Sequence, residues 1–504
     1  MNSNIQRTLA VILGLLCFTP AYADKCSAIL EISFPDVQML EATHIDAPAP
    51  HCKAKGRIGR DIHFSVWLPD DWNGRFVMGG AGGFVREEDN QAIRFLGPSV
   101  LTRGYATAST DTGHQGDGRS NDWGYHNYEA IVNYAYLAMH RAVVSAKAVI
   151  ADHYGKAAEK SFFIGCSNGG RQALHEAQRY PNDFDAIVAG APALNFSGVA
   201  GAFLDITQRM YPNPGDLTSP LVSKSDRELL RTALERECDA LDGQTDGIIS
   251  DPTACAFDPG VLQCKAGAET NCLTAEKIAA INAVYAGPHD SKGQIFFGFP
   301  FGAENIETNG WGMWLTGGAE SGPPSAAWAF GMGIMRNFVF HDQTWTYRNY
   351  NWDSFRDQTA AIASLIDAKN PDLSAFRAQG GKLLMFHGWA DVALTAHMST
   401  DYIERVWSQD SAAREDTRLY MMPGVLHCAG GPGPSYVDWL DVVETWHDTG
   451  IPPETLVAHY PPGGEASGAR LLCPWPQKQV YDGGPANEPG SYTCVAATGN
   501  AAAR

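Results

Sequence analysis

The sequence predicts an α/β fold in which a mostly parallel sheet is interrupted by a large inserted domain. Strand-like and helix-like segments alternate up to about Pro192, and the alternation resumes near Gly380 after a long stretch of different composition. Such alternation is typical of a parallel sheet covered by helices. The length of 504 residues also exceeds what one compact core usually fills, which favours a second structural unit.

The first part of the predicted sheet comes from short segments rich in apolar residues. Residues 61–68 alternate polar and apolar side chains, as a half-buried strand does. Further strands are expected at residues 75–78, 105–110, 160–164 and 186–189. The spacing of apolar residues predicts one long helix over 130–154 and another over 170–180, which Pro181 ends. Residues 24–196 therefore form the first part of the core.

The inserted domain is expected at residues 197–378. This stretch is rich in Gly, Pro, Trp and Asp and lacks the regular alternation, so we interpret it as a lid over the core. The strand pattern returns at residues 382–386 and 417–422, with a helix at 399–406 between them. Residues 379–504 therefore form the second part of the core.

The N-terminus has the pattern of an export signal. Arg7 supplies a positive charge, the run from Leu9 to Phe18 is apolar, and small residues at Ala21 and Ala23 form a cleavage site. A run of ten apolar residues is too short to span a bilayer, which needs about 20. We expect residues 1–23 to be a cleaved signal peptide, without a membrane anchor, and the product to be secreted into the periplasm or the medium.

The charge and the cysteine count agree with that interpretation. A formal net charge of −19 and no basic cluster argue against a nucleic-acid partner. Removing Cys17 from the total of 11 cysteines leaves ten, an even number that fits disulfides in an oxidising compartment. Spacing alone leaves the pairing open, and no pair has the separation typical of a zinc knuckle.

A nucleophile motif lies between a predicted strand and a predicted helix. Residues 165–169 read Gly-Cys-Ser-Asn-Gly, which is the G-x-S-x-G pattern of an α/β-hydrolase. The glycines permit a sharp turn that exposes the Ser167 hydroxyl above the sheet. The fold expected for the chain is therefore an α/β-hydrolase core with a mostly parallel sheet and a large inserted lid domain.

A serine nucleophile needs a base, and the base needs an orienting acid. In α/β-hydrolases the acid and then the histidine follow the serine along the chain. Asp391 follows the strand at 382–386, and His427 follows the strand at 417–422. An isolated Asp or His in a loop is more often a capping or solvated residue, but two successive strand-end loops supply both partners in the required order. Ser167, Asp391 and His427 are the predicted triad.

The oxyanion of a tetrahedral intermediate needs amide donors. One donor is expected to be the N–H of Asn168, directly after the nucleophile, and the other to come from the Gly-rich loop at residues 79–83. The pattern alone does not separate Gly82 from Gly83, and a plain flexible turn is the alternative interpretation. A phosphate-binding loop is less compatible, because no Lys follows it.

Together these residues resemble the tannase and feruloyl esterase family. Cys166-Ser167, Asp391 and His427-Cys428 match its CS-D-HC signature, and the similarity covers nearly the whole mature chain. It implies Gly83 as the second oxyanion donor and a disulfide between the cysteines beside the serine and the histidine. The implied disulfides are Cys26–Cys52, Cys166–Cys428, Cys238–Cys255, Cys264–Cys272 and Cys473–Cys494.

An acidic loop in the lid is a candidate calcium site. Residues 239–248 contain three aspartates and two glycines, and clustered oxygen ligands suit calcium. The spacing is not that of an EF-hand, so from the residues alone a solvated acidic loop is equally plausible. The resemblance implies a structural calcium and no organic cofactor. The implied ligands are the carboxylates of Asp239, Asp242 and Asp246 and the backbone carbonyls of Gln244 and Ile248.

The resemblance implies hydrolysis of small aromatic esters with hydroxycinnamoyl or benzoyl-type acyl groups. Trp314 and Trp328 of the lid and His387 before the acid loop are the predicted substrate contacts, with Trp311 and Phe330 as further aromatic surface. The alternative for each aromatic residue is lid core.

Three other functions remain open. Hydrolysis of terephthalate monoesters would favour an Arg for the free carboxylate, but Trp328 stands where the resemblance would place it, with Arg336 nearby. A lipase lid would be more aliphatic. A non-catalytic binding protein would have lost the serine or the histidine. The sequence carries no signal for an oligomeric state.

Overall fold

The computed structural model describes residues 25–85, 90–267, 270–317, 324–463 and 466–496. The expected signal peptide and Cys17 lie outside these residues. The centre of the molecule is a ten-stranded sheet with the order β1-β2-β3-β4-β6-β5-β7-β8-β11-β12. Its strands are β1 (Ser33–Phe34), β2 (Val37–Ile45), β3 (His51–Ile58), β4 (Ile62–Pro69), β5 (Arg75–Gly80), β6 (Ala106–Thr110), β7 (Lys160–Cys166), β8 (Ala186–Gly190), β11 (Lys382–Gly388) and β12 (Thr417–Met422).

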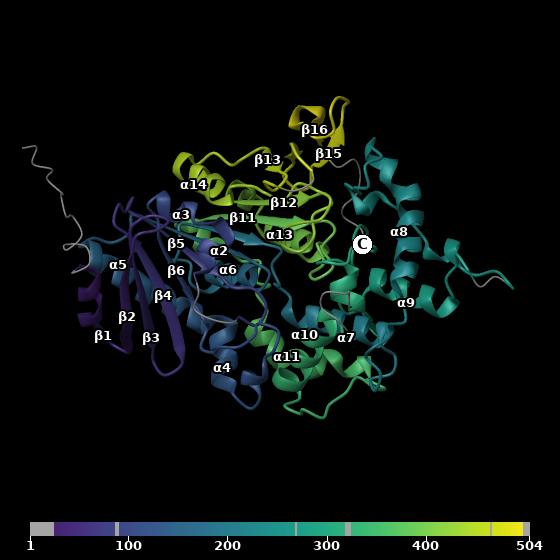
Figure 1. Ribbon diagram of the computed structural model, residues 1–504, viewed down its shortest axis with the longest axis horizontal. Helices are drawn as coiled ribbons and strands as arrows, with labels where there is room; N and C mark the ends of the chain where they lie inside the picture. Colours follow the sequence, from purple (N-terminus) through teal and green to yellow (C-terminus); the bar gives the residue numbers. More distant parts are fainter. Residues whose placement is uncertain (1–24, 86–89, 268–269, 318–323, 464–465, 497–504) are drawn as a thin grey trace, which may run out of the picture.

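The sheet is mixed, and its parallel part carries the predicted site. The strands from β6 to β12 along the sheet pair in parallel, whereas β1 to β4 pair antiparallel and β4 joins β6 antiparallel. All seven predicted strands are present. The antiparallel extension β1–β3 was not predicted. In Figure 1 it forms the purple edge of the sheet, far from the lid helices.

Helices cover both faces of the parallel part. On one face, α5 (Ala138–Tyr154), α6 (Asn168–Arg179) and α13 (His397–Gln409) pack on alternate strand residues such as Phe163 and Met385. On the other, α2 (Gln91–Leu96), α3 (Ser99–Thr102) and α14 (Trp439–Thr449) pack on the intervening residues, such as Phe162 and Leu384. Because both faces are buried, these strands are mostly apolar, with small Thr and Ser side chains in β6 and polar residues at the starts of β7 and β12. The long helix predicted over 130–154 is divided into α4 (Tyr128–Val132), a wider π turn (Asn133–Leu137) and α5.

The segment between β8 and β11 adds no described strand to the large sheet. It contains the helices α7 (Phe196–Met210), α8 (Lys224–Cys238), α9 (Ala275–Ala286), α10 (Ala326–Gly333), α11 (Phe355–Ile366) and α12 (Ser374–Ala378), with a small hairpin of β9 (His289–Asp290) and β10 (Gly293–Gln294). In Figure 1 its teal and green helices gather beside one end of the sheet. After α14, two antiparallel pairs follow, β13 (Leu456–His459) with β14 (Ala469–Leu472) and β15 (Lys478–Tyr481) with β16 (Tyr492–Val495).

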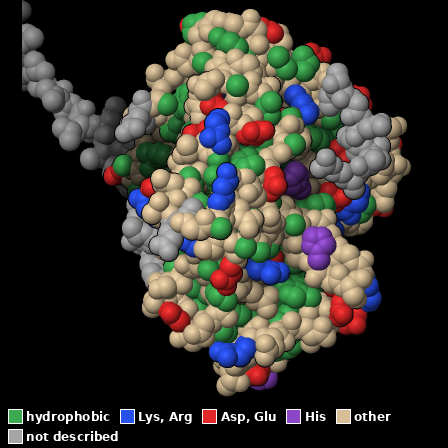
Figure 2. Space-filling view, turned by 90° about the vertical axis from the view of Figure 1, so that its right-hand side faces the viewer, with side chains coloured by type: hydrophobic (Ala, Val, Ile, Leu, Met, Phe, Trp, Pro, Cys, Tyr) green, Lys and Arg blue, Asp and Glu red, His purple; other side chains and the backbone are tan. Residues whose placement is uncertain are grey.

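Two surface properties bear on possible partners. On the face shown in Figure 2, acidic and basic side chains are interspersed rather than gathered by sign. Among the helices of the described residues, none is long and apolar enough to cross a membrane.

Candidate active site

Ser167 occupies a sharp turn between β7 and α6. Its backbone has φ 65° and ψ −127°, a conformation that a residue with a side chain rarely adopts. Neighbouring segments hold the turn, because the Ser167 N–H donates to Gly190 O at 3.0 Å and its carbonyl accepts from Ala193 N–H at 3.1 Å. The predicted nucleophile elbow is therefore formed, and strain of this kind is typical of functional sites.

The glycines around the elbow let three backbones meet. A Cβ on Gly169 would lie 2.6 Å from the carbonyl oxygen of Gly80 on β5, and one on Gly165 would lie 2.5 Å from the carbonyl oxygen of Gly169. No side chain fits at those distances. The glycines thus bring the start of α6 directly onto β5 and β7, beside Ser167.

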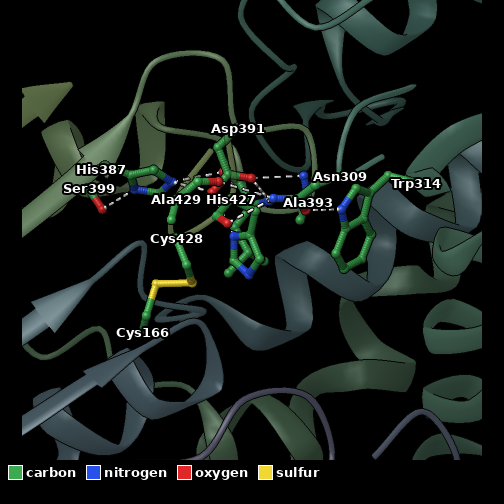
Figure 3. The surroundings of a disulfide bond; sticks show 11 residues. Cys166, Asn309, Trp314, His387, Asp391, Ala393, Ser399, His427, Cys428 and Ala429 are labelled. Atoms are coloured by element: carbon green, nitrogen blue, oxygen red, sulfur yellow. Dashed lines mark hydrogen bonds and ion pairs between the residues drawn. A yellow bond between two sulfur atoms is a disulfide. The ribbon is translucent and has the colours of Figure 1, made fainter. Parts of the chain in front are cut away.

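Asp391 and His427 meet at the carboxyl ends of β11 and β12. The Nδ1 atom of His427 lies 2.8 Å from Oδ2 of Asp391 (Figure 3). Because a carboxylate only accepts, Nδ1 carries the proton and Nε2 is left as the acceptor. The two loops are also joined by a 3.0 Å hydrogen bond from Ala390 N–H to Val425 O. His427 and Ser167 line the same cavity.

The Asp391 carboxylate is fully buried and held ionised. Its Oδ1 accepts from the N–H groups of Ala393 at 2.8 Å and Leu394 at 2.9 Å. Burial alone would raise the pKa of this carboxyl, but the charge of His427 and hydrogen bonds from His387 and His427 outweigh it and hold the pKa well below its usual value. The carboxylate can therefore orient the imidazole and balance its charge.

The prediction that His387 contacts substrate is wrong. Its side chain is fully buried and does not line the cavity beside Ser167. Instead, Nε2 lies 3.2 Å from Oδ2 of Asp391 and 2.9 Å from the carbonyl oxygen of Leu394, while Nδ1 lies 2.8 Å from the Ser399 hydroxyl (Figure 3). His387 therefore contacts Asp391, the acid of the predicted triad, and not the cavity.

A cavity of about 390 Å³ opens beside Ser167, and we call it the Ser167 cavity. Core and lid both contribute to its lining, which is mainly apolar. Its aromatic side chains are Phe84, Phe95, Tyr134, Phe196, Phe203, Trp314 and Phe330. Its charged or amide side chains, besides His427, are Gln91, Arg94, Arg119 and Asn168. Trp314 lines this cavity, and its contact with substrate stays a prediction.

Trp314 is held in place by Asn309, which lies in the segment between β8 and β11. The indole Nε1–H donates to Asn309 Oδ1 at 3.0 Å, and Asn309 Nδ2–H donates to the backbone carbonyl of His427 at 2.9 Å. The Trp314 ring also meets the His427 ring edge-on, with centroids 5.8 Å apart. Asn309 therefore connects the lid to the loop that carries the base, which the sequence analysis missed.

The prediction for Trp328 is wrong. Trp328 lines a separate hollow with Tyr347 and Arg348, and Arg336 lies in that hollow as well. Trp328 lies in the first turn of α10, where its N–H donates to the capping Ser325 side chain. Its own side chain packs on a different buried cluster, which includes Tyr347 and Phe355. Trp311 is fully buried lid core.

The two predicted oxyanion donors, Asn168 and Gly83, line the same cavity as Ser167. Asn168 is the first residue of α6, so its N–H belongs to the helix turn whose amides have no intrahelical acceptor. Gly83 lines the Ser167 cavity and has φ 58°. A Cβ there would lie 2.5 Å from the carbonyl oxygen of Gly118, so this loop geometry requires glycine.

The acidic loop follows α8, and its aspartate side chains accept hydrogen bonds from backbone N–H groups of the same loop. Asp239 is buried and accepts from Gly247 N–H at 3.1 Å, and Asp246 accepts from Ile248 N–H at 3.0 Å and pairs with Arg470. The disulfide Cys238–Cys255 closes the chain around this loop. Carboxylates and backbone carbonyls are the oxygen donors that calcium prefers, so the residues present fit that ion.

All five implied disulfides are present. They are Cys26–Cys52, Cys166–Cys428, Cys238–Cys255, Cys264–Cys272 and Cys473–Cys494. Cys166–Cys428 connects the residue before Ser167 to the residue after His427, with Cα atoms 5.9 Å apart (Figure 3).

Comparisons with known proteins agree with this geometry. Residues 48–495 match the family described as tannase and feruloyl esterase. The chain is 31% identical to the mono(2-hydroxyethyl) terephthalate hydrolase of Piscinibacter sakaiensis, covering 88% of this chain and 85% of that protein. It is 33% identical to a probable feruloyl esterase of Arthroderma benhamiae, covering 86% and 82%.

A solved structure has the same fold. Feruloyl esterase B from Aspergillus oryzae superposes with a TM-score of 0.84 at 24% identity, covering 94% of this chain and 100% of that chain. The α/β-hydrolase fold predicted from the nucleophile motif is thereby confirmed. From the extent of the family match and the identity to curated relatives, the chain belongs to the tannase and feruloyl esterase family of carboxylic ester hydrolases.

Proposed function

We propose that the protein is a serine esterase for small aromatic esters, with Ser167 as nucleophile, His427 as general base and Asp391 as orienting acid. The observation that carries the proposal is the hydrogen bond from His427 Nδ1–H to the ionised, buried Asp391, because it leaves Nε2 as an acceptor on the cavity that Ser167 lines. A non-catalytic binding protein would have no use for a strained serine beside such a pair.

The reaction follows from these positions. The Ser167 hydroxyl attacks the ester carbonyl carbon while His427 takes its proton, and the N–H groups of Gly83 and Asn168 stabilise the oxyanion. The tetrahedral intermediate then collapses, the C–O bond to the alcohol breaks, and His427 returns the proton to the leaving alcohol. Water, deprotonated by His427, attacks the acyl-enzyme and releases the acid and Ser167.

The acyl group is proposed to be a hydroxycinnamate or benzoate. The lining of the Ser167 cavity is mainly apolar, and rings such as Phe84, Trp314 and Phe330 can pack against a planar acyl group. Relatives named as feruloyl esterases support this substrate class.

A second candidate substrate class is a terephthalate monoester. The expected arginine is absent at Trp328, but Arg94 and Arg119 line the Ser167 cavity, and among its described lining residues there is no carboxylate. A guanidinium there could pair with a free carboxylate on the ring.

Substitution of Ser167 by Ala tests the mechanism. The variant should fold, because only the nucleophile is removed, and should lose at least about 1,000-fold in kcat, in line with loss of a triad member. Hydrolysis of methyl ferulate, methyl gallate and a terephthalate monoester by both proteins measures this and ranks the substrates. Wild-type-like turnover by the variant would refute the triad. A wild-type protein that binds these esters without turnover would indicate a binding protein.

Export and calcium binding are proposed along with the activity. We propose that residues 1–23 direct secretion, that residues 197–378 form the lid domain between core segments 24–196 and 379–504, and that the loop at residues 239–248 holds a structural calcium. Its carboxylates are those of Asp239, Asp242 and Asp246, and its backbone carbonyls are those of Gln244 and Ile248.

Removal of calcium should lower the melting temperature by several degrees. A metal bound only by the folded chain contributes about 2.7 kcal/mol when present at 100 times its Kd. Calorimetry with and without a calcium chelator measures the change. The Asp242→Asn variant should melt lower even in calcium and should respond little to the chelator. Identical melting curves for the wild type in both buffers, with no calcium in the purified protein, would contradict the proposal.

A further inference from the structure

A second cluster of ionisable side chains lies outside the Ser167 cavity, between α5 and α6. His140 belongs to α5, Glu176 to the last turn of α6, and Asp183 to the loop that leads to β8. One potential ligand atom from each lies within 4.8 Å of the other two. Ser167 precedes the opposite end of α6, so the cluster has no part in the proposed esterase reaction.

Glu176 makes this cluster unusual. Its side chain is 1% exposed, and among the described residues neither carboxylate oxygen has a hydrogen-bond partner. A buried carboxylate without a partner is strongly destabilising, so native structures normally supply a counter-charge, a hydrogen bond or a metal ion.

Ionisable groups next to Glu176 include Asp183, Lys147 and His140. Asp183 Oδ2 lies 2.6 Å from Nδ1 of His140, and the Lys147 ammonium donates to the backbone carbonyl of Asp183. Lys147 also interacts electrostatically with both carboxylates. Lys147 donates to the Asp183 carbonyl and His140 pairs with Asp183, so neither gives Glu176 a hydrogen bond, and a cation bound between the two carboxylates would supply the partner that Glu176 lacks.

We propose that His140, Glu176 and Asp183 bind a divalent transition-metal ion, with zinc as the best match. Calcium takes six to eight oxygen ligands, whereas one imidazole nitrogen with two carboxylate oxygens is a donor set that zinc accepts. At zinc distances of about 2.0–2.2 Å, tetrahedral ligand atoms lie about 3.3–3.6 Å apart, so the cluster needs shifts of about 1 Å.

The surroundings allow such an ion to enter and to be held. The His140 and Asp183 side chains are 30% and 13% exposed, so solvent reaches the cluster and water can complete the coordination. The His140 ring stacks on Tyr180, with centroids 3.8 Å apart, which restrains its orientation. The bound ion would join α5 to the end of α6 and to the loop before β8, and would stabilise the core away from the nucleophile.

Zinc titration of the full mature protein tests the proposal. Calcium is kept in every buffer so that the acidic lid loop does not take up zinc. Wild-type protein should retain one zinc ion per chain after gel filtration and melt at a higher temperature with it. Loss of a residue that only supports a zinc ligand weakens binding by about 10- to 100-fold. Glu176→Gln and His140→Gln remove proposed ligands, so each should weaken zinc binding by at least that factor and leave esterase activity unchanged.

A matched control is the His44–Asp70 pair, which has a 3.0 Å contact and similar partial exposure. Exposed Asp46 lies 3.7 Å from the other ring nitrogen of His44, but these residues do not form a group of three ligand atoms within the described part of the chain. Asp70→Asn should bind zinc as the wild type does. Because the His140 side chain is partly exposed, His140→Gln should fold, and it tests the proposal if Glu176→Gln does not fold. The proposal is overturned if the wild-type protein retains no zinc, or if the His140 and Glu176 variants retain as much as the wild type. A proton shared by the Glu176 and Asp183 carboxylates would then explain the buried cluster.

Discussion

At the scale of single residues, the protonation of His387 follows from its neighbours. Its Nε2 faces two acceptors, the Asp391 carboxylate and the Leu394 carbonyl, so Nε2 carries the proton. Its Nδ1 lies 2.8 Å from the Ser399 hydroxyl, so the ring bridges the acid loop and the start of α13. His387 is thus a positioning residue, because it reaches the ester only through Asp391 and His427.

Replacement of His387 by Phe should lower kcat by about 10- to 100-fold, because a displaced Asp391 no longer orients His427. KM should change little, since His387 does not line the Ser167 cavity. His387→Gln places an amide N–H near the position of Nε2 and should recover part of the rate. Steady-state kinetics on methyl ferulate measures both parameters.

His175 provides the control for that experiment. It is equally buried and bonds to the Ile366 carbonyl at 2.9 Å, away from the triad. His175→Gln should retain the wild-type kcat. If Phe and Gln at position 387 give the same kcat, or if KM rises in proportion, the positioning role is refuted.

At the scale of elements, the proposed base depends on a loop with no regular structure. His427 lies between β12 and the antiparallel pairs that follow α14, in a segment where Cys428 has φ 65°. The disulfide to Cys166 fastens this loop to the elbow after β7, across two intervening strands of the sheet. It therefore constrains the distance between nucleophile and base.

Replacing Cys166 and Cys428 together by Ser should reduce kcat by about 100-fold, because small displacements of reacting groups can lower a reaction rate by about that factor. The free energy of unfolding should fall by about 2–5 kcal/mol. Activity assays and denaturant unfolding measure the two effects. The Cys473→Ser/Cys494→Ser variant, which opens the disulfide between β14 and β16, should lose stability but keep the parental kcat. Equal kcat in both double variants would count against the positioning role of Cys166–Cys428.

The elements that could be predicted are those whose pattern comes from burial on both faces. β7 and β12 are apolar after their first two residues, and the predicted segments cover residues 160–164 of β7 and all of β12. β3 was missed because its buried positions include small residues such as Ala54 and Gly56 between long charged ones, which weakens the alternation. The π turn at Asn133–Leu137 keeps a nearly helical spacing and was not separable from α5.

The meeting of Ser167, Asp391 and His427 at one end of the sheet could be predicted because each follows a strand in a fixed order, whereas the rest of the cavity could not. Its walls combine Phe84, Arg119 and Trp314, which are far apart in the sequence. Whether Trp314 or Trp328 faces the cavity depends on lid packing that no local pattern records. His387 lies four residues before Asp391, and only the loop geometry turns it behind the acid.

At the scale of the whole molecule, buried histidines make stability depend on pH. His114 is 8% exposed, stacks on Trp123 and contacts the Phe84 carbonyl. Burial lowers its pKa to about 4. The unfolded chain binds a proton near pH 6.5 and the folded chain does not, so this contribution is complete above about pH 6.5 and is lost as pH falls to about 4.

The His114→Gln variant should therefore lose less stability on acidification. The fall in unfolding free energy between pH 7 and pH 4 should be smaller than in the wild type by about 2–3 kcal/mol. Denaturant unfolding at the two pH values measures the difference. The exposed His459 serves as control, since His459→Gln should follow the wild type. An equal fall in the wild type and His114→Gln would contradict the expectation.

Asn309 gives the lid an influence on rate as well as on recognition. Its side-chain oxygen accepts from the Trp314 indole at the wall of the Ser167 cavity, and its side-chain nitrogen donates to the backbone carbonyl of His427. An acyl group too bulky for the cavity must push Trp314 aside, and that movement is transmitted through Asn309 to the base. Oversized esters should then be discriminated by slow turnover of the bound complex rather than by failure to bind, and would act as competitive inhibitors of the esters that fit.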